Sequence, residues 1–200
     1  MAEDIVDRNY GSLLDLPPAR KAKKSVFTEI EIKDIEKAAL GGNIWAGTIL
    51  ILIYTGMRVG ELLALTRFNL DLENWVITGG IKTDAGRDRP VPVHLKIRKY
   101  ITHWVNHPGR RLIHRDGNPI SVDYYRKSIF YPELDRLEIN RKDRKLTPHS
   151  TRHTFATMLD KAGAKTTAIQ NLLGHADYST TANTYTHQDF SELWEAINLI

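Results

Sequence analysis

The sequence predicts an α+β domain that is mainly helical and contains a small antiparallel sheet of three strands. Strong helix starts occur at Thr28 and at Thr147-Pro148. From residue 94 onward, apolar residues recur at the three- and four-residue spacing of amphipathic helices. Between these regions, residues 75–93 are divided into short extended pieces by glycines, which favours a small sheet.

Size and composition indicate one domain that stays in a reducing compartment. The chain has 200 residues, no cysteine and a 42% apolar content, so it can bury a sizeable core without disulfides or thiolate metal sites. The sequence shows no signal peptide, which predicts a cytoplasmic location. Its longest apolar run, residues 49–53, is far shorter than the roughly 20 residues that span a membrane.

The positive charge is concentrated in the middle of the chain. The whole sequence carries +4, whereas residues 1–16 and residues 186–200 each carry −3, so residues 17–185 carry +10. A basic middle between acidic ends fits a surface that binds a polyanion.

The first 25 residues are predicted to be a linker, because Pro17-Pro18 break regular structure and a short basic run follows. We expect this linker to have joined another domain upstream. Residues 26–200 then form the domain itself, and its first helix starts at Thr28. Thr28 is its N-cap and Glu31 completes a capping box.

Two further helices are predicted before the sheet. Residues 45–54 are apolar on all sides, so periodicity does not separate a buried helix from a buried strand, and their length favours the helix. After a break at Thr55-Gly56, residues 58–64 form a short helix that places Glu61 one turn beyond Arg58 on the same face.

The sheet is expected to consist of residues 75–77, 81–82 and 91–93, with a hairpin over residues 83–88. The rest of the chain is expected to be helical, with apolar faces at 93–104 and 122–137 and helix ends at the glycines 163 and 174. In the last segment, Trp194 and Ile197 share a face that no later residue remains to cover.

His149 and Arg152 are the first two candidate active-site residues. On a helix that starts at Thr147-Pro148, side chains three residues apart share a face, and this face lies near the positive helix N-terminus. A phosphate group fits such a position. Arg58 offers a second guanidinium, and Glu61 is expected to orient it or to hold the local fold.

Four motifs of this chain resemble the active-site half of the tyrosine recombinases, the phage-integrase family. They are T-G-M-R-V-G-E-L-L-A-L (55–65), I-K-T-D-A-G-R-D-R-P-V-P-V (81–93), L-T-P-H-S-T-R-H-T-F-A-T-M-L (146–159) and L-L-G-H-A-D-Y-S-T-T-A-N-T-Y-T-H (172–187). The resemblance covers residues 26–200 and implies the catalytic-domain fold of that family.

The resemblance implies a catalytic set of six residues, namely Arg58, Lys82, His149, Arg152, His175 and Tyr185. Tyr185 stands at the position of the nucleophile, and His175 stands in the segment that binds the scissile phosphate. Lys82 resembles the hairpin lysine that acts as general acid, although Arg87 or Arg89 could compete for that role. A tyrosine of ordinary pKa near 10 needs a proton acceptor, which His149 or the phosphate itself provides.

The implied reaction is attack of Tyr185 on a DNA phosphate, which gives a 3′-phosphotyrosine and a free 5′-OH. Neither a metal nor ATP is required, so no cofactor is expected. The implied partners are double-stranded DNA and three further copies in a tetramer, with the segment 189–200 packed on a neighbouring protomer. The family's upstream core-binding domain is missing, which indicates a catalytic fragment of a nucleoid-associated, mobile-element or phage integrase.

The sequence leaves three alternative interpretations of these residues open. A type IB topoisomerase uses the same residues but reseals one strand, and a decayed DNA-binding module would keep the basic surface alone. A zinc site at His149 and His153, completed by His175 or His187, is disfavoured because the first histidine is not followed by glutamate and no cysteine is present.

Overall fold

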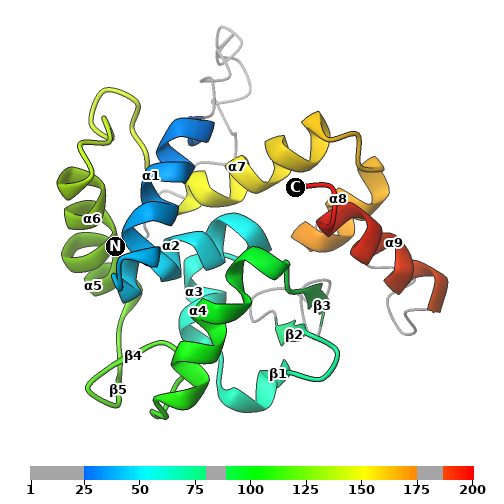
Figure 1. The fold of residues 1–200 in the computed structure, drawn as a ribbon, viewed down its shortest axis with the longest axis horizontal. Helices are drawn as coiled ribbons and strands as arrows, with labels where there is room; N and C mark the ends of the chain where they lie inside the picture. The colour runs from blue at the N-terminus through cyan, green and yellow to red at the C-terminus, as the bar shows by residue number, and fades with distance from the viewer. Residues whose placement is uncertain (1–24, 80–88, 175–186) are drawn as a thin grey trace, which may run out of the picture.

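The computed structural model describes residues 25–79, 89–174 and 187–200. Its helices are α1 (Glu29–Leu40), α2 (Ile44–Thr55), α3 (Val59–Ala64), α4 (Leu95–Asn106), α5 (Val122–Tyr124), α6 (Tyr131–Arg136), α7 (Pro148–Lys161), α8 (Thr166–Leu173) and α9 (His187–Ile197). Its strands are β1 (Leu70–Asp71), β2 (Val76–Gly79), β3 (Arg89–Pro92), β4 (His114–Arg115) and β5 (Asn118–Pro119). The predicted fold class, helical with a small antiparallel sheet, is confirmed (Figure 1).

Helix α2 is the centre of the fold. Ten of its twelve residues are buried, and it packs against α1, α4 and α7. A helix that is apolar on all sides needs neighbours all round, which explains why the apolar run became a central helix rather than a surface one. It ends at Gly56, whose φ of 63° is left-handed. No helix of the described chain is long and apolar enough to cross a membrane.

The predicted helix starts are confirmed at both positions. The Thr28 hydroxyl accepts the backbone N–H of Glu31, and the Glu31 carboxylate accepts the N–H of Thr28 at 2.7 Å. Thr147 is the N-cap of α7, and Pro148 occupies the first helical position, where no backbone donor is needed. Both of these helices pack against α2.

The three-stranded sheet exists, but its strands differ from the predicted ones. Strand β2 is central and pairs antiparallel with β1 on one side and with β3 on the other. Strand β1 could not be predicted from the sequence, because two residues are too few to show an alternating pattern. Trp75 lies before β2 with a φ of 54°, in the turn from β1. The expected strand 81–82 and hairpin 83–88 lie outside the described residues.

The prediction that all residues after 94 are helical is wrong at one place. Strands β4 and β5 form a hairpin with a two-residue turn, in which His114 pairs with Pro119 and Arg115 with Asn118. The turn residues Asp116 and Gly117 both have positive φ, at 51° and 79°. An Asp-Gly pair is a strong hairpin signal, so this element was readable from the sequence.

The helical region around Pro132 is continuous. Residues Tyr125–Phe130 form a π-helical segment between α5 and α6, and the N–H of Tyr131 bonds to the carbonyl of Arg126. A proline cannot donate the usual hydrogen bond four residues back, and the wider turn accommodates this loss. Tyr125 and Leu134 are buried as predicted, whereas Val122 is 45% exposed.

The last helix is covered by its own chain. Leu193, Ala196 and Ile197 of α9 are buried in a cluster with Phe155 of α7 and residues of α8. The cover for this face comes from earlier parts of the chain, because α8 and β3 pack against α9. Figure 1 shows α9 beside α8, at the opposite end of the molecule from α5 and α6.

Candidate active site

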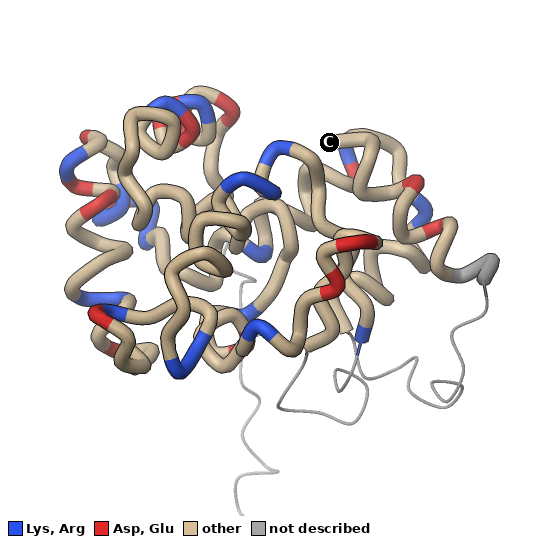
Figure 2. The backbone as a smooth tube through the Cα atoms, turned by 60° about the horizontal axis from the view of Figure 1, so that its bottom comes forward, with Lys and Arg blue, Asp and Glu red and all other residues tan. Residues whose placement is uncertain are grey.

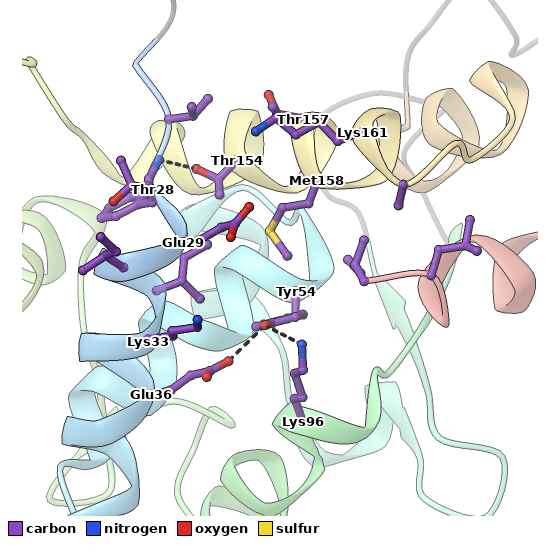
Figure 3. A pocket seen from close by; sticks show the side chains of 17 residues that line it. Thr28, Glu29, Lys33, Glu36, Tyr54, Lys96, Thr154, Thr157, Met158 and Lys161 are labelled. Carbon is purple, nitrogen blue, oxygen red and sulfur yellow. Dashed lines mark hydrogen bonds between the residues drawn. The ribbon is translucent and has the colours of Figure 1, made fainter.

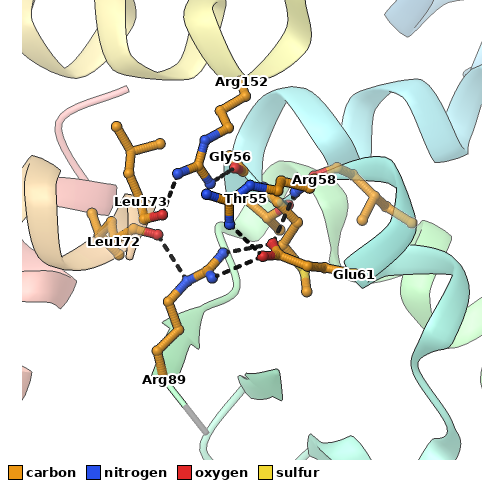
Figure 4. A network of polar contacts seen from close by, with 10 residues as sticks. Thr55, Gly56, Arg58, Glu61, Arg89, Arg152, Leu172 and Leu173 are labelled. Atoms are coloured by element: carbon orange, nitrogen blue, oxygen red, sulfur yellow. Dashed lines mark hydrogen bonds and ion pairs between the residues drawn. The ribbon is translucent and has the colours of Figure 1, made fainter. Parts of the chain in front are cut away.

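The structure brings two of the six predicted catalytic residues together and places a third on the same helix as one of them. Arg58 and Arg152 lie on either side of Gly56, at the end of α2 (Figure 4). His149 lies on α7, one turn before Arg152. Lys82, His175 and Tyr185 lie outside the described residues.

Arg152 joins three helices at one point. Its side chain is buried, at 5% exposure, and it donates to the carbonyl of Gly56 at 2.8 Å. A second donor bonds to the carbonyl of Leu173, the last residue of α8. Carbonyls at helix ends have no partner within their helix and carry partial negative charge, so they are natural acceptors for a guanidinium.

Arg58 is held by the glutamate that follows it in sequence. Its guanidinium donates to one oxygen of Glu61 at 2.7 Å, and its backbone N–H donates to the other at 2.9 Å. Glu61 is 4% exposed, whereas the Arg58 side chain is 34% exposed. The expectation that Glu61 orients Arg58 is therefore supported by both contacts, and Arg58 keeps access to solvent.

Arg89 is a third arginine of this cluster. The sequence suggests it only as an alternative to Lys82 for the role of general acid. It is 1% exposed and donates to both oxygens of Glu61, at 3.0 and 3.4 Å. A buried guanidinium in a two-pronged ion pair is unsuited to supply a proton to a leaving group, so these contacts favour a structural role for Arg89. The missed signal is the alternation of Arg89, Val91 and Val93 on one buried face, where an arginine needs a partner.

The cluster carries more positive than negative charge. Three guanidiniums, of Arg58, Arg89 and Arg152, lie around the single carboxylate of Glu61, which pairs with the first two, and the cluster keeps an excess of two positive charges. Burial, followed by the charges of Arg58 and Arg89, lowers the pKa of Arg152 to about 10, although Glu61 acts in the opposite direction. An anion bound here would relieve this repulsion.

In the Glu61 carboxyl, burial and the neighbouring arginines shift the pKa in opposite directions. Burial by itself raises its pKa, but the hydrogen bonds and charge of Arg89, with the hydrogen bonds from Arg58, outweigh burial and lower the pKa to about 2. A carboxyl with a lowered pKa stabilises the fold above its ordinary pKa of 4.5, and this contribution is lost as the pH falls toward 2.

We therefore expect acid to erase the stability difference between the wild type and Glu61→Gln. At pH 6 the wild type should be more stable by about 3 kcal/mol, and the difference should shrink steadily between pH 4.5 and pH 2. Urea unfolding at four pH values measures it. A difference that stays constant over this range contradicts the ionised, doubly paired Glu61.

Gly56 is required at the centre of the cluster for steric reasons. Its φ of 63° is unfavourable for other residues, and a Cβ atom there would overlap the ring of Phe155. Its carbonyl also accepts the bond from Arg152. The glycine of the T-G-M-R motif therefore allows α2, α7 and Arg152 to approach closely.

Gly56→Ala is expected to destabilise the fold by about 2–4 kcal/mol, from backbone strain and overpacking together. Gly163→Ala is the matched control, because Gly163 also has positive φ, at 81°, but has open space around it. That variant should lose only about 1 kcal/mol. Equal losses in urea unfolding would show that contact with Phe155 does not matter.

His149 is exposed on the first turn of α7 and stacks edge-on against His153, with the ring centroids 4.6 Å apart. It lies on the same helix as Arg152, one turn closer to the helix start. Within the described part of the chain, no group of three or more His, Cys, Asp or Glu side chains is placed to hold a metal ion.

Comparison with known proteins assigns the chain to a family. The model of the phage integrase family matches residues 25–192, which is most of the sequence. This chain belongs to the phage integrase family. Arg58, His149 and Arg152 all lie within the matched region.

Curated relatives of this integrase-family chain are tyrosine recombinases. XerD of Halalkalibacterium halodurans is 32% identical over 94% of this chain and 65% of its own length. XerD of Staphylococcus aureus is 34% identical over 76% of this chain and 52% of its own length. XerC of Chlamydia pneumoniae is 30% identical over 64% of this chain. The chain thus spans 42–65% of the length of these relatives.

Solved structures share the fold of this integrase-family domain. The Tn1549 transposon integrase, in complex with circular intermediate DNA, superposes with a TM-score of 0.67 at 24% identity, over 94% of this chain and 68% of the other. The XerA recombinase gives a TM-score of 0.67 at 24% identity, over 93% of this chain and 70% of the other. These likenesses establish the recombinase catalytic-domain fold.

A separate cavity of about 690 Å³ lies on the face of α7 opposite to Arg152 (Figure 3). It is lined by α1, by the second half of α7 and by the last two residues of the chain. At its floor, the Tyr54 hydroxyl donates to Glu36 at 3.0 Å and accepts from Lys96 at 3.2 Å. Burial and the nearby Glu36 carboxylate raise the pKa of Tyr54. The cavity shares no residue with the arginine cluster.

Proposed function

We propose that this chain is the catalytic domain of a site-specific DNA recombinase or integrase. In this proposal, Tyr185 attacks a DNA phosphate and becomes joined to the 3′ end, and the 5′ oxygen leaves as a hydroxyl. A 5′-OH of the partner strand then attacks the phosphotyrosine and releases Tyr185. The bond energy is conserved in the protein–DNA link, so the reaction uses neither metal nor ATP.

The observation that carries the proposal is the excess positive charge at Arg58 and Arg152. A phosphate under attack gains negative charge, and preorganised guanidiniums stabilise it more strongly than the ground state. Basic and acidic positions are interspersed along the rest of the described chain (Figure 2), and several form local pairs such as Arg126 with Asp123. In the cluster, by contrast, three guanidiniums lie around one carboxylate.

The other residues supply the remaining chemistry in the proposal. His149, on the same helix face as Arg152, contacts the phosphate or accepts the proton of Tyr185. Lys82 donates a proton to the departing 5′ oxygen, and His175 hydrogen-bonds the scissile phosphate. These roles rest on the family motifs around each residue.

The partners in this proposal are double-stranded DNA and further copies of the same chain. Residues 26–200 form the catalytic domain, and residues 1–25 connect it to a core-binding domain. Four copies assemble on DNA, and the segment 189–200 moves from its place against α8 to a neighbouring copy. The protein then acts in the cytoplasm, on the nucleoid.

A library of randomised nicked duplexes, which trap the cut strand, tests the chemistry. With chelator present and ATP absent, we expect a detergent-resistant protein–DNA adduct and a released strand that carries a 5′-OH. Cleavage that depends on added magnesium, or an adduct through a 5′ phosphate, contradicts the proposal. On plasmids with a selected site, strand exchange supports a recombinase, whereas relaxation of supercoils alone indicates a type IB topoisomerase.

A further inference from the structure

Arg89 is the most deeply buried charged side chain of the described chain, and the family motifs assign it no chemistry in the proposed reaction. It is the first residue of β3 and is 1% exposed. Charged groups are seldom buried so completely unless paired, because their removal from water is expensive. Its contacts must therefore compensate for the cost of burying its charge.

Those contacts join three elements of the site. The Nε of Arg89 donates to the carbonyl of Leu172 at 3.1 Å, and its two amino groups donate to the carboxylate of Glu61 (Figure 4). The next carbonyl along α8, of Leu173, accepts from Arg152. Arg89 thus links β3, α3 and the end of α8, where Arg152 is also fixed.

The carboxylate of Glu61 divides its bonds evenly between two arginines. One oxygen accepts from the guanidiniums of Arg58 and Arg89, and the other accepts from the Arg58 backbone N–H and from Arg89. Arg89 therefore balances the charge of Glu61 from the buried side. Without Arg89, the Glu61 carboxylate would pair with Arg58 alone. The net charge of the cluster would then fall from two positive charges to one.

We infer that Arg89 is a positioning residue that, by balancing Glu61 and holding the end of α8, keeps Arg58 and Arg152 aligned and positively charged toward the scissile phosphate. The inference rests on the proposed function, because it concerns the phosphate of that reaction. Arg89 acts through Glu61 and does not itself contact DNA. A lysine at this position would keep the charge, but it is a point donor and lacks the fork that reaches Glu61 and Leu172 together.

Single-turnover adduct formation on nicked duplexes tests the inference, with rates measured as a function of DNA concentration. Arg89→Lys and Arg89→Met should lower the rate at saturating DNA by about tenfold or more, with the half-saturating concentration changed less than about threefold. Melting curves and circular dichroism establish that each variant is folded. Arg141→Met is the matched control, because Arg141 forms a similar two-pronged pair, with Asp135, outside the cluster.

A compensating variant separates positioning from simple support of the fold. In Arg89→Met, the unbalanced Glu61 neutralises Arg58, so adding Glu61→Gln should return at least about a third of the lost rate, on a logarithmic scale. A folded Arg89→Met that keeps the wild-type rate, or a double variant no faster than Arg89→Met, overturns the inference. Absence of adduct with the wild-type protein overturns the proposed function, and the inference falls with it.

Discussion

Arg152→Ala is expected to slow cleavage of DNA by about a thousandfold, the usual scale for loss of one group that stabilises transition-state charge. Arg152 is the most buried described member of the proposed phosphate site, and the neighbouring positive charges of Arg58 and Arg89 favour binding of an anion there. The rate of adduct formation on nicked duplexes measures the effect.

DNA with an uncharged scissile linkage distinguishes loss of the Arg152 charge from loss of the folded structure. DNA with a methylphosphonate at the scissile position lacks one charged oxygen, so it needs less positive charge from the protein. Arg152→Ala should therefore recover at least about tenfold on this substrate relative to the wild type. The variant also leaves the carbonyls of Gly56 and Leu173 without their donor, and melting curves show how far that loss destabilises the fold. Equal defects on both substrates would contradict charge neutralisation.

Glu61→Ala is expected to have the largest effect on stability, about 3–5 kcal/mol. The change leaves Arg89 buried without its counter-ion, and the Leu172 carbonyl alone does not replace a carboxylate. Urea unfolding at neutral pH measures the loss. Asp123→Ala is the control, because its ion pairs with Arg126 and Lys127 are exposed and should contribute less than about 1 kcal/mol.

The double variant Glu61→Ala with Arg89→Met should regain a large part of that stability. Replacing a buried ion pair by apolar side chains is often neutral, whereas removing one partner is not. If the double variant is as unstable as the sum of the two single variants, the two residues do not interact as described.

Local signals in the sequence predicted most helices of this fold. The capping box of Thr28 and Glu31 and the proline after Thr147 fix helix starts through neighbouring residues only. The long apolar run could be assigned to α2 because strands of that length are uncommon. Elements that depend on distant partners were harder: β1 has two residues and exists because Leu70 pairs with Ile77.

The site was predicted in part for the same reason. Arg58 is the N-cap of α3 and Glu61 its third residue, so their contact follows from the geometry of a helix start. The pairing of Glu61 with Arg89 spans 28 residues, and the acceptors in α8 are backbone carbonyls, which carry no sequence signal. The motifs indicated Arg58 and Arg152, whereas the role of Arg89 and the charge balance among the three arginines could be seen only in the fold.

The most direct test of this account is to locate the residue that becomes linked to DNA. Adduct formed in chelator on nicked duplexes is digested, and the modified peptide is sequenced by mass spectrometry. We predict a phosphotyrosyl link on Tyr185, which is lost in Tyr185→Phe and retained in Tyr178→Phe, a control in the same segment. A link on another residue, or an adduct that persists in Tyr185→Phe, would contradict the assignment of Tyr185 as the nucleophile.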